Sequence, residues 1–318
     1  MKYRAIIREA WMQTQENKNL IWWFAFVPSL LSILVGIVYF GYQALSLWNS
    51  PYIRSGASGH FFGDLIGKIV ALFETQPGLM VFGIVLVAIV LLAYLFLPVF
   101  TQGALIQMVA HIRAGEKVSV AQGVGYGFTR FLQLFEYHLF IKTFSFVSIL
   151  TEVTFAFRVL GPEPFQIFGW IFALVFVVGL LLTLLVTYSE YYIVIDKVGM
   201  FSSVIKSSGL VIRQWHHTLF MLLLMSIIII RIALNVLVTL LVPALVLAPV
   251  FLFTSLTLVK IGAVIGALVG LVVLYFASYF LGVFHVFVTT VWTFTFLDLT
   301  HEEKHAVDLH EAAVHLEE

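Results

Sequence analysis

The chain has 318 residues, of which 61% are hydrophobic and 11% charged, and its mean hydropathy is +1.04. Soluble domains are about 45–50% apolar and about 25% charged, so this composition excludes an ordinary soluble protein and indicates that lipid is the solvent. The 17 Lys and Arg balance the 17 Asp and Glu. This balance argues against a nucleic-acid partner, which needs clustered surplus cations. The absence of cysteine excludes disulfides and thiolate chemistry.

Six apolar runs are long enough to cross a bilayer, because a helix of about 20 apolar residues spans it. They cover approximately residues 20–47, 79–103, 134–157, 166–192, 217–242 and 262–296. The first run follows a charged stretch that is too long for a signal peptide. Residues 240–260 are also apolar, but Pro243 and Pro249 disfavour a continuous helix there. We expect a membrane-embedded or interfacial connection; the alternative is a seventh span, which would place the C-terminus outside.

Lysine and arginine predict the orientation, because short cytoplasmic loops are enriched in these residues. With the N-terminus inside, eleven of them fall in cytoplasmic segments. The external segments hold four: Arg54, Lys68, Arg158 and Lys260. The sequence therefore predicts a multi-pass protein of the cytoplasmic (inner) membrane, with its N-terminus and C-terminus both cytoplasmic.

An internal repeat organises the chain into three parts, approximately residues 1–110, 111–196 and 197–298. Each part begins with a short amphipathic helix, whose helically spaced apolar residues beside cations predict a position in the headgroup plane and contact with anionic lipid headgroups. Each continues into a two-span hairpin. The hairpin ends LVTYSEYYIVID (185–196) and FVTTVWTFTFLD (287–298) match, and VFTQGALIQMVA (99–110) fits them loosely.

The predicted fold class is therefore all-α. It is a six-span transmembrane helical bundle built from three repeats of interfacial amphipathic helix plus helical hairpin. Residues 1–298 form a single polytopic membrane domain, and residues 299–318 form an acidic, histidine-containing cytoplasmic tail.

Two long segments carry a family resemblance. The sequence TQGALIQMVAHIRAGEKVSVAQGVGYGFTRFLQLF after the second run and MFSSVIKSSGLVIRQWHHTLF before the fifth resemble a bacterial polytopic membrane domain. That domain is found at the N-terminal side of some glycerophosphoryl diester phosphodiesterases, and it has uncharacterised stand-alone relatives. The resemblance extends over nearly the whole chain. It implies a membrane domain without that enzymatic activity, because those enzymes carry catalysis on a separate soluble barrel and only about 20 residues follow the last run here.

Ionisable residues within the predicted spans are the first candidates for function, because each costs several kcal/mol in lipid unless it is paired or hydrated. A helical rise of about 1.5 Å per residue sorts them into two depths. The mid-membrane polar layer contains Glu152, Arg231, Asn235 and His285. The inner polar layer contains Glu136, His138, Lys142 and Glu190.

Two interpretations of these layers stay open, besides the alternative that the spans have other limits and leave these groups at an interface. One is an ion or anion pathway in which Glu152 and His285 exchange protons and Arg231 binds charge. The other, which we favour, is a pair of buried salt bridges, Glu152–Arg231 and Lys142–Glu190, that set the register between helices.

Small residues predict close helix packing at two places. Gly262, Gly266 and Gly270 form a stripe on the sixth run, which lets another helix approach closely. That helix belongs either to the same chain, the favoured interpretation, or to a second copy. The segment QGVGYGF (122–128) does not follow a strand, so it predicts a hinge or close-packing segment rather than a phosphate loop.

The tail contains the sequence HEEKH, which has the spacing of a zinc hydrolase motif, with Glu302 as the general base. The candidate metal ligands are His301, His305, Asp308 and His315. The favoured interpretation is a solvated amphipathic tail. The others are a metal-binding or regulatory tail that takes up adventitious Zn or Ni, and a membrane metallohydrolase that uses the motif.

The sequence thus supports three functional hypotheses, in decreasing order. The first is a non-enzymatic multi-pass protein that organises partners or lipids, and the second is a transporter or permease that uses the mid-membrane layer. The third is the metallohydrolase. The partners expected are the bilayer, anionic headgroups, and a second copy or another membrane protein. No cofactor is expected.

Overall fold

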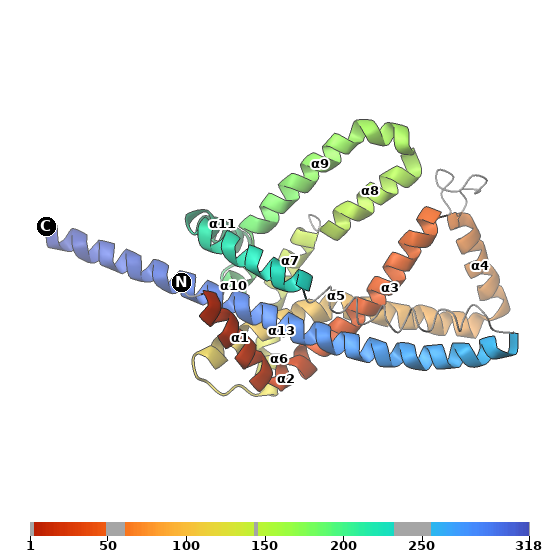
Figure 1. Ribbon diagram of the computed structural model, residues 1–318, viewed down its shortest axis with the longest axis horizontal. Coiled ribbons are helices and arrows are strands. Elements are labelled where there is room, and N and C mark those ends of the chain that lie inside the picture. The colour runs from red at the N-terminus through yellow and green to blue at the C-terminus, as the bar shows by residue number, and fades with distance from the viewer. Residues whose placement is uncertain (1–2, 49–60, 143–145, 232–255, 318) are drawn as a thin grey trace. The chain divides into compact units, whose positions relative to one another are not determined.

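The computed structural model describes residues 3–48, 61–142, 146–231 and 256–317, and every regular element in these ranges is a helix (Figure 1). The chain divides into two compact units, Met1–Leu30 with Leu210–Glu318, and Leu31–Gly209, and each is described by itself. The expectation of an all-α fold is confirmed for the described residues.

The unit formed by the two ends of the chain contains the long helix α13 (Leu256–Glu317). Helix α1 (Tyr3–Glu16) packs on α13, and Trp11 lies edge-on to Phe287 with 5.5 Å between ring centroids. α2 (Lys18–Leu20) and the π-helical turn η1 (Ile21–Ala25) then lead into α3 (Phe26–Trp48). η1 packs on α13 at Gly282, where an added Cβ would lie 3.4 Å from backbone atoms of Ala25 and Phe26. The two helices are thus in van der Waals contact at this glycine.

The second unit is formed by the middle of the chain. After the rest of α3, its helices are α4 (Phe61–Thr75), α5 (Pro77–Arg113), α6 (Val120–Thr129), α7 (Phe131–Lys142), α8 (Phe146–Leu160), α9 (Pro162–Leu185), α10 (Ser189–Val194) and the first part of α11 (Met200–Arg213). α8 and α9 pack side by side as a hairpin (Figure 1). Their tight turn uses Gly161, whose φ of +82° favours glycine, and Pro162 then starts α9.

Three of the described helical segments are long and apolar enough to cross a membrane: Lys18–Trp48, Pro77–Arg113 and Leu268–His301. A fourth is added if Met200–Arg213 and Trp215–Arg231, which are bent by 94° relative to each other, count as one span. The first, second and sixth predicted runs therefore correspond to long apolar helices. The helix over Trp215–Arg231 covers the start of the fifth run, and residues 232–255, which include most of the 240–260 connection, lie outside the described residues.

The predicted fourth run is not one continuous helix, so its limits are corrected. α9 ends at Leu185, residues 186–188 form a turn, and α10 begins at Ser189. The break falls at two β-branched residues, Val186 and Thr187, and the hydroxyl of Thr187 bonds back to the carbonyl of Leu184 at 2.7 Å. Such local bonds compete with helix continuation. The third run falls on α7 and α8, and residues 143–145 between them lie outside the described residues.

The tail is not separated from the last apolar run in the backbone. α13 continues through residues 299–317 without interruption. No glycine or proline follows Gly282, and the tail is rich in alanine, glutamate and leucine, which are strong helix formers. The helical form assumed for the HEEKH spacing is present, while the side chains beyond His301 lie outside what the structure describes.

Buried residues are concentrated in three stretches, approximately 99–109, 186–194 and 286–299. They fall in the three segments that the sequence aligned, 185–196 with 287–298 and, loosely, 99–110. α6 packs on the first stretch, within α5, and the hydroxyl of Ser207 in α11 bonds to residues 185 and 188 at the second. α1 contacts the third through Trp11 and Phe287. The three amphipathic helices thus cover the three buried stretches.

The glycines of α6 allow its close contact with α5, as the QGVGYGF segment predicted. An added Cβ at Gly127 would lie 2.6 Å from the ring of Phe100, which also contacts Phe128 at 4.8 Å between centroids. The stacked rings of His111 and Tyr126, 4.9 Å apart, join the same two helices.

Replacing Gly127 by leucine should destabilise the protein by about 1–3 kcal/mol, because the ring of Phe100 must leave its site. Gly125→Leu is the matched control, since Gly125 is exposed on the same helix and has no atom within 4 Å of its added Cβ. It should be neutral or stabilising by up to about 1 kcal/mol through helix propensity. Thermal unfolding in detergent micelles, followed by tryptophan fluorescence, measures both; equal midpoints would contradict the packing argument.

Candidate functional site

The site begins with the break between α9 and α10, which exposes backbone groups that a continuous helix would pair. The hydroxyl of Ser207, on α11, satisfies two of them. It donates to the carbonyl of Leu185 at 2.8 Å and accepts from the backbone N–H of Tyr188 at 3.0 Å. The hydroxyl of Tyr137 on α7 donates to the carbonyl of Val186 at 3.0 Å. The Ser207 side chain therefore replaces missing helical bonds, while Tyr137 adds a bond to a carbonyl that also accepts from the backbone N–H of Ser189.

This break places Glu190, in the first turn of α10, beside α5 and α7. The amide of Gln102 on α5 donates to Oε2 of Glu190 at 2.9 Å. Nε2 of His138 on α7 lies 3.4 Å from the other carboxylate oxygen, Oε1. The side chains of His138 and Glu190 are 25% and 20% exposed, so the contacts are only weakly screened by solvent. One carboxylate thus joins three helices.

A second amide lengthens the contact between α5 and α10. Nε2 of Gln107 donates to the carbonyl of Val194 at 3.0 Å, at the far end of α10. Gln102 and Gln107 therefore hold α10 against α5 at both of its ends. This arrangement fixes a six-residue helix that could not be stable alone.

Both carboxylate oxygens of Glu190 face a polar group of the protein, which is the arrangement of a structural clamp. Comparisons of the chain with protein-family models, with curated proteins and with solved structures find no match. Among the described residues, no group of three or more His, Asp or Glu side chains could hold a metal ion. The interactions at the site are the hydrogen bond from Gln102 and the charge contact between His138 and Glu190.

The structure brings together two members of the predicted inner polar layer, His138 and Glu190. Glu136 is exposed on α7 and is not part of the cluster. The side chain of Lys142 lies outside the described residues, so its salt bridge to Glu190 stays a prediction. Gln102 was missed as a site residue, although it is a polar residue in an apolar run and lies in the hairpin end that fits the one containing Glu190.

The mid-membrane layer is only partly described. Glu152 is exposed on α8 and Arg231 is exposed in the other unit, where His285 is partly buried on α13. Asn235 lies outside the described residues. The Glu152–Arg231 pair therefore stays a prediction.

The remaining candidates lie on α13. Gly270 is exposed, and a Cβ added there would meet open space. The surroundings of Gly262 and Gly266 are outside the described part of the chain. His301 is exposed, and the side chains of His305, Asp308 and His315 are not described. The packing role of the stripe stays a prediction, and α13 contacts η1 and the start of α3 at Gly282, which the sequence pattern did not single out.

α11 is a second functional feature, because large apolar residues lie on its exposed face while its buried face combines Leu210 and Val211 with small serines. The small residues Ser203 and Ser207 are fully buried. Large apolar residues of the helix face outward: Phe201 is 77% exposed, Ile205 72% and Ile212 66%. The cations Lys206 and Arg213 are exposed beside them. An outer surface of this kind suits the headgroup region of a bilayer.

Proposed function

We propose that this chain is a non-enzymatic multi-pass protein of the cytoplasmic membrane that organises anionic lipids at its cytoplasmic face. The single observation that carries the proposal is the outer face of α11, where Phe201 and Ile205 project beside Lys206. Apolar side chains at this level enter the acyl boundary while cations contact lipid phosphates, each worth about 1 kcal/mol near an anionic surface. The exposed Phe201 and Ile205 are the apolar surface that an interfacial helix places in the lipid.

The proposed architecture has six spans in three repeats, with both termini cytoplasmic. It is supported by the way the amphipathic helices pack. α6, which opens the second repeat, packs on the hairpin end of the first, and α11, which opens the third, bonds to the hairpin end of the second. α1, which opens the first repeat, packs on the hairpin end of the third. The same relation thus recurs cyclically, as three copies of one unit would produce.

Within this proposal, the chain is a relative of the polytopic domain that it resembles. The Glu190 clamp supports a structural role for that domain, because its carboxylate is used to fix helices. The alternative is a transporter whose path includes Glu152, Arg231 and His285. The two differ in access of water to the middle of the membrane, which a water-soluble maleimide can report at single cysteines introduced at positions 152, 231 and 285 of this cysteine-free chain.

The proposal predicts a selective lipid boundary around the reconstituted protein. Spin-labelled phosphatidylglycerol should be enriched at the protein surface roughly two-fold over spin-labelled phosphatidylcholine, as measured by the motionally restricted component of the electron spin resonance spectrum. The Lys206→Gln, Arg213→Gln double variant should lose a large part of this preference. Lys206→Arg, which keeps the charge, should retain it. Equal restriction of the two lipids by the unaltered protein would refute the proposed function.

A further inference from the structure

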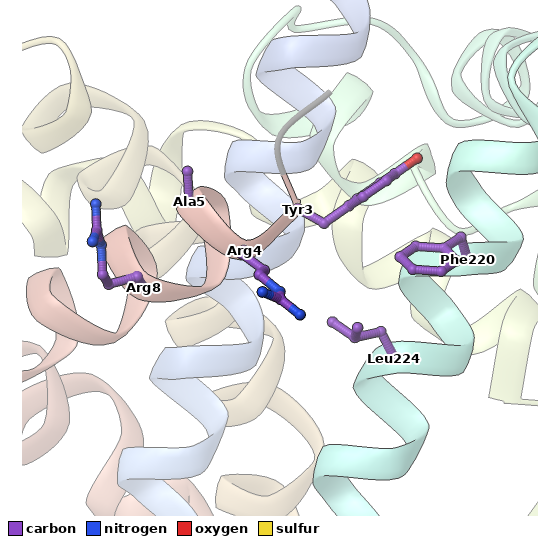
Figure 2. Close-up of a pocket in the computed structure, with 6 residues that line it drawn as sticks. All are labelled: Tyr3, Arg4, Ala5, Arg8, Phe220 and Leu224. Atoms are coloured by element: carbon purple, nitrogen blue, oxygen red, sulfur yellow. The ribbon is translucent and has the colours of Figure 1, made fainter.

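An open groove lies between α1 and the helix over Trp215–Arg231, within the unit formed by the chain ends. Its volume is about 790 Å³ and it is lined by Tyr3, Arg4, Ala5, Arg8, Phe220 and Leu224. This volume falls in the range of ligand sites, about 300–1,000 Å³. Figure 2 shows Arg4 reaching from α1 toward Leu224, with the rings of Tyr3 and Phe220 facing each other.

The aromatic side of the groove is held in place by a polar contact. The hydroxyl of Tyr3 is hydrogen-bonded to Nδ1 of His217. The rings of Tyr3 and Phe220 are 4.6 Å apart between centroids. Leu224 lies one helical turn beyond Phe220. The apolar side of the groove therefore runs along the helix over Trp215–Arg231, which covers the start of the fifth apolar run.

The charge of the groove comes from two arginines one turn apart on α1. Arg4 and Arg8 are exposed and occupy i and i+4 positions, where like charges repel each other. Within the described part of the chain, neither guanidinium has a carboxylate partner. The first turn of α1 contains no acidic residue, so the positive end of the helix dipole adds to the same field. In Figure 2 the two guanidinium groups point to different sides of α1, and Arg4 is therefore the primary ligand.

We propose that this groove binds one anionic glycerophospholipid of the inner leaflet, with its phosphodiester on Arg4 and an acyl chain along Phe220 and Leu224. The site rests on the proposed function and names one lipid position within it. A guanidinium offers paired N–H donors that match phosphate oxygens. Free phosphate would use the arginine but would leave the apolar wall uncovered, which is why a lipid is the favoured occupant.

The test is native mass spectrometry of the full chain, released from detergent and titrated with dioleoyl phosphatidylglycerol. We expect a 1:1 adduct that Arg4→Gln weakens about tenfold and Arg4→Lys weakens less. Lys18→Gln, which removes another exposed cation of the same unit outside the groove, should leave it unchanged. Leu224→Gln should weaken the adduct while all charges remain. Glycerol phosphate and inorganic phosphate should not form an adduct at the same concentrations.

The outcomes separate this site from the broader proposal. The Lys206→Gln, Arg213→Gln variant should keep the 1:1 adduct while its preference for phosphatidylglycerol at the lipid boundary falls. The Arg4→Gln variant should keep the boundary preference while its 1:1 adduct weakens. If the unaltered protein has the boundary preference but Arg4→Gln binds the lipid as tightly as wild type, the groove is not the site. An adduct with inorganic phosphate of equal strength would overturn the lipid assignment in favour of a free anion.

Discussion

Replacement of Ser207 by alanine is expected to destabilise the protein by about 2–4 kcal/mol. Ser207 is fully buried and its hydroxyl serves both the carbonyl of Leu185 and the N–H of Tyr188. Alanine leaves both groups without this partner, and an unsatisfied buried polar group costs about 1–3 kcal/mol. Water cannot easily replace the hydroxyl, because Ser207 and Tyr188 are both fully buried. Thermal unfolding in detergent, followed by tryptophan fluorescence, measures the loss.

Ser208→Ala is the matched control for this experiment. Ser208 neighbours Ser207 on α11, but its hydroxyl donates only to the carbonyl of Val204 in its own helix. Both substitutions gain the same helix propensity, so their difference reports the bonds to residues 185 and 188. Ser208→Ala should change stability by no more than about 0.5 kcal/mol. Ser207→Thr, which keeps the hydroxyl, should recover part of the loss, and identical unfolding of the two alanine variants would mean that Ser207 does not hold the break.

Replacement of Glu190 by alanine should destabilise the protein by about 2–3 kcal/mol. The carboxylate is only one-fifth exposed and joins α5, α7 and α10 through Gln102 and His138. Its removal leaves the amide of Gln102 and the imidazole of His138 with no carboxylate to face. Glu136→Ala is the control, because the carboxylate of Glu136 is exposed on α7. The free energy of unfolding of this variant should lie within about 0.5 kcal/mol of the wild-type value.

A double-mutant cycle tests whether the clamp is a unit. Glu190→Ala and Gln102→Ala should together cost about 1–2 kcal/mol less than the sum of the single effects, because residues in one hydrogen-bonded network are coupled. Chemical unfolding midpoints of the four proteins supply the comparison. Simple additivity would show that Glu190 and Gln102 stabilise the fold independently, and the clamp would then have to be abandoned.

The sequence alone determined that the protein is helical and that lipid is its solvent. Both conclusions depend only on the hydropathy of short, continuous stretches of sequence. A run of about 20 apolar residues is sufficient to predict a helix long enough to span, and the helices over Lys18–Trp48, Pro77–Arg113 and Leu268–His301 satisfy that condition. The close packing of α6 was also predictable from QGVGYGF. Gly123 and Gly127 lie one helical turn apart, so they leave a groove on one face of the helix.

The clamp and the break between α9 and α10 were decided only by the tertiary structure. Hydropathy assigned residues 166–192 to one helix, since no glycine or proline interrupts the segment near Val186. Ser207, 22 residues away from Leu185, pairs backbone groups that the break releases, and Tyr137, 49 residues away from Val186, adds a second bond to a carbonyl in the turn. A hydropathy average over neighbouring residues contains no information about hydrogen-bond donors that are so distant in the sequence. The same limit hid Gln102, whose amide gains its role only when the break turns Glu190 toward α5.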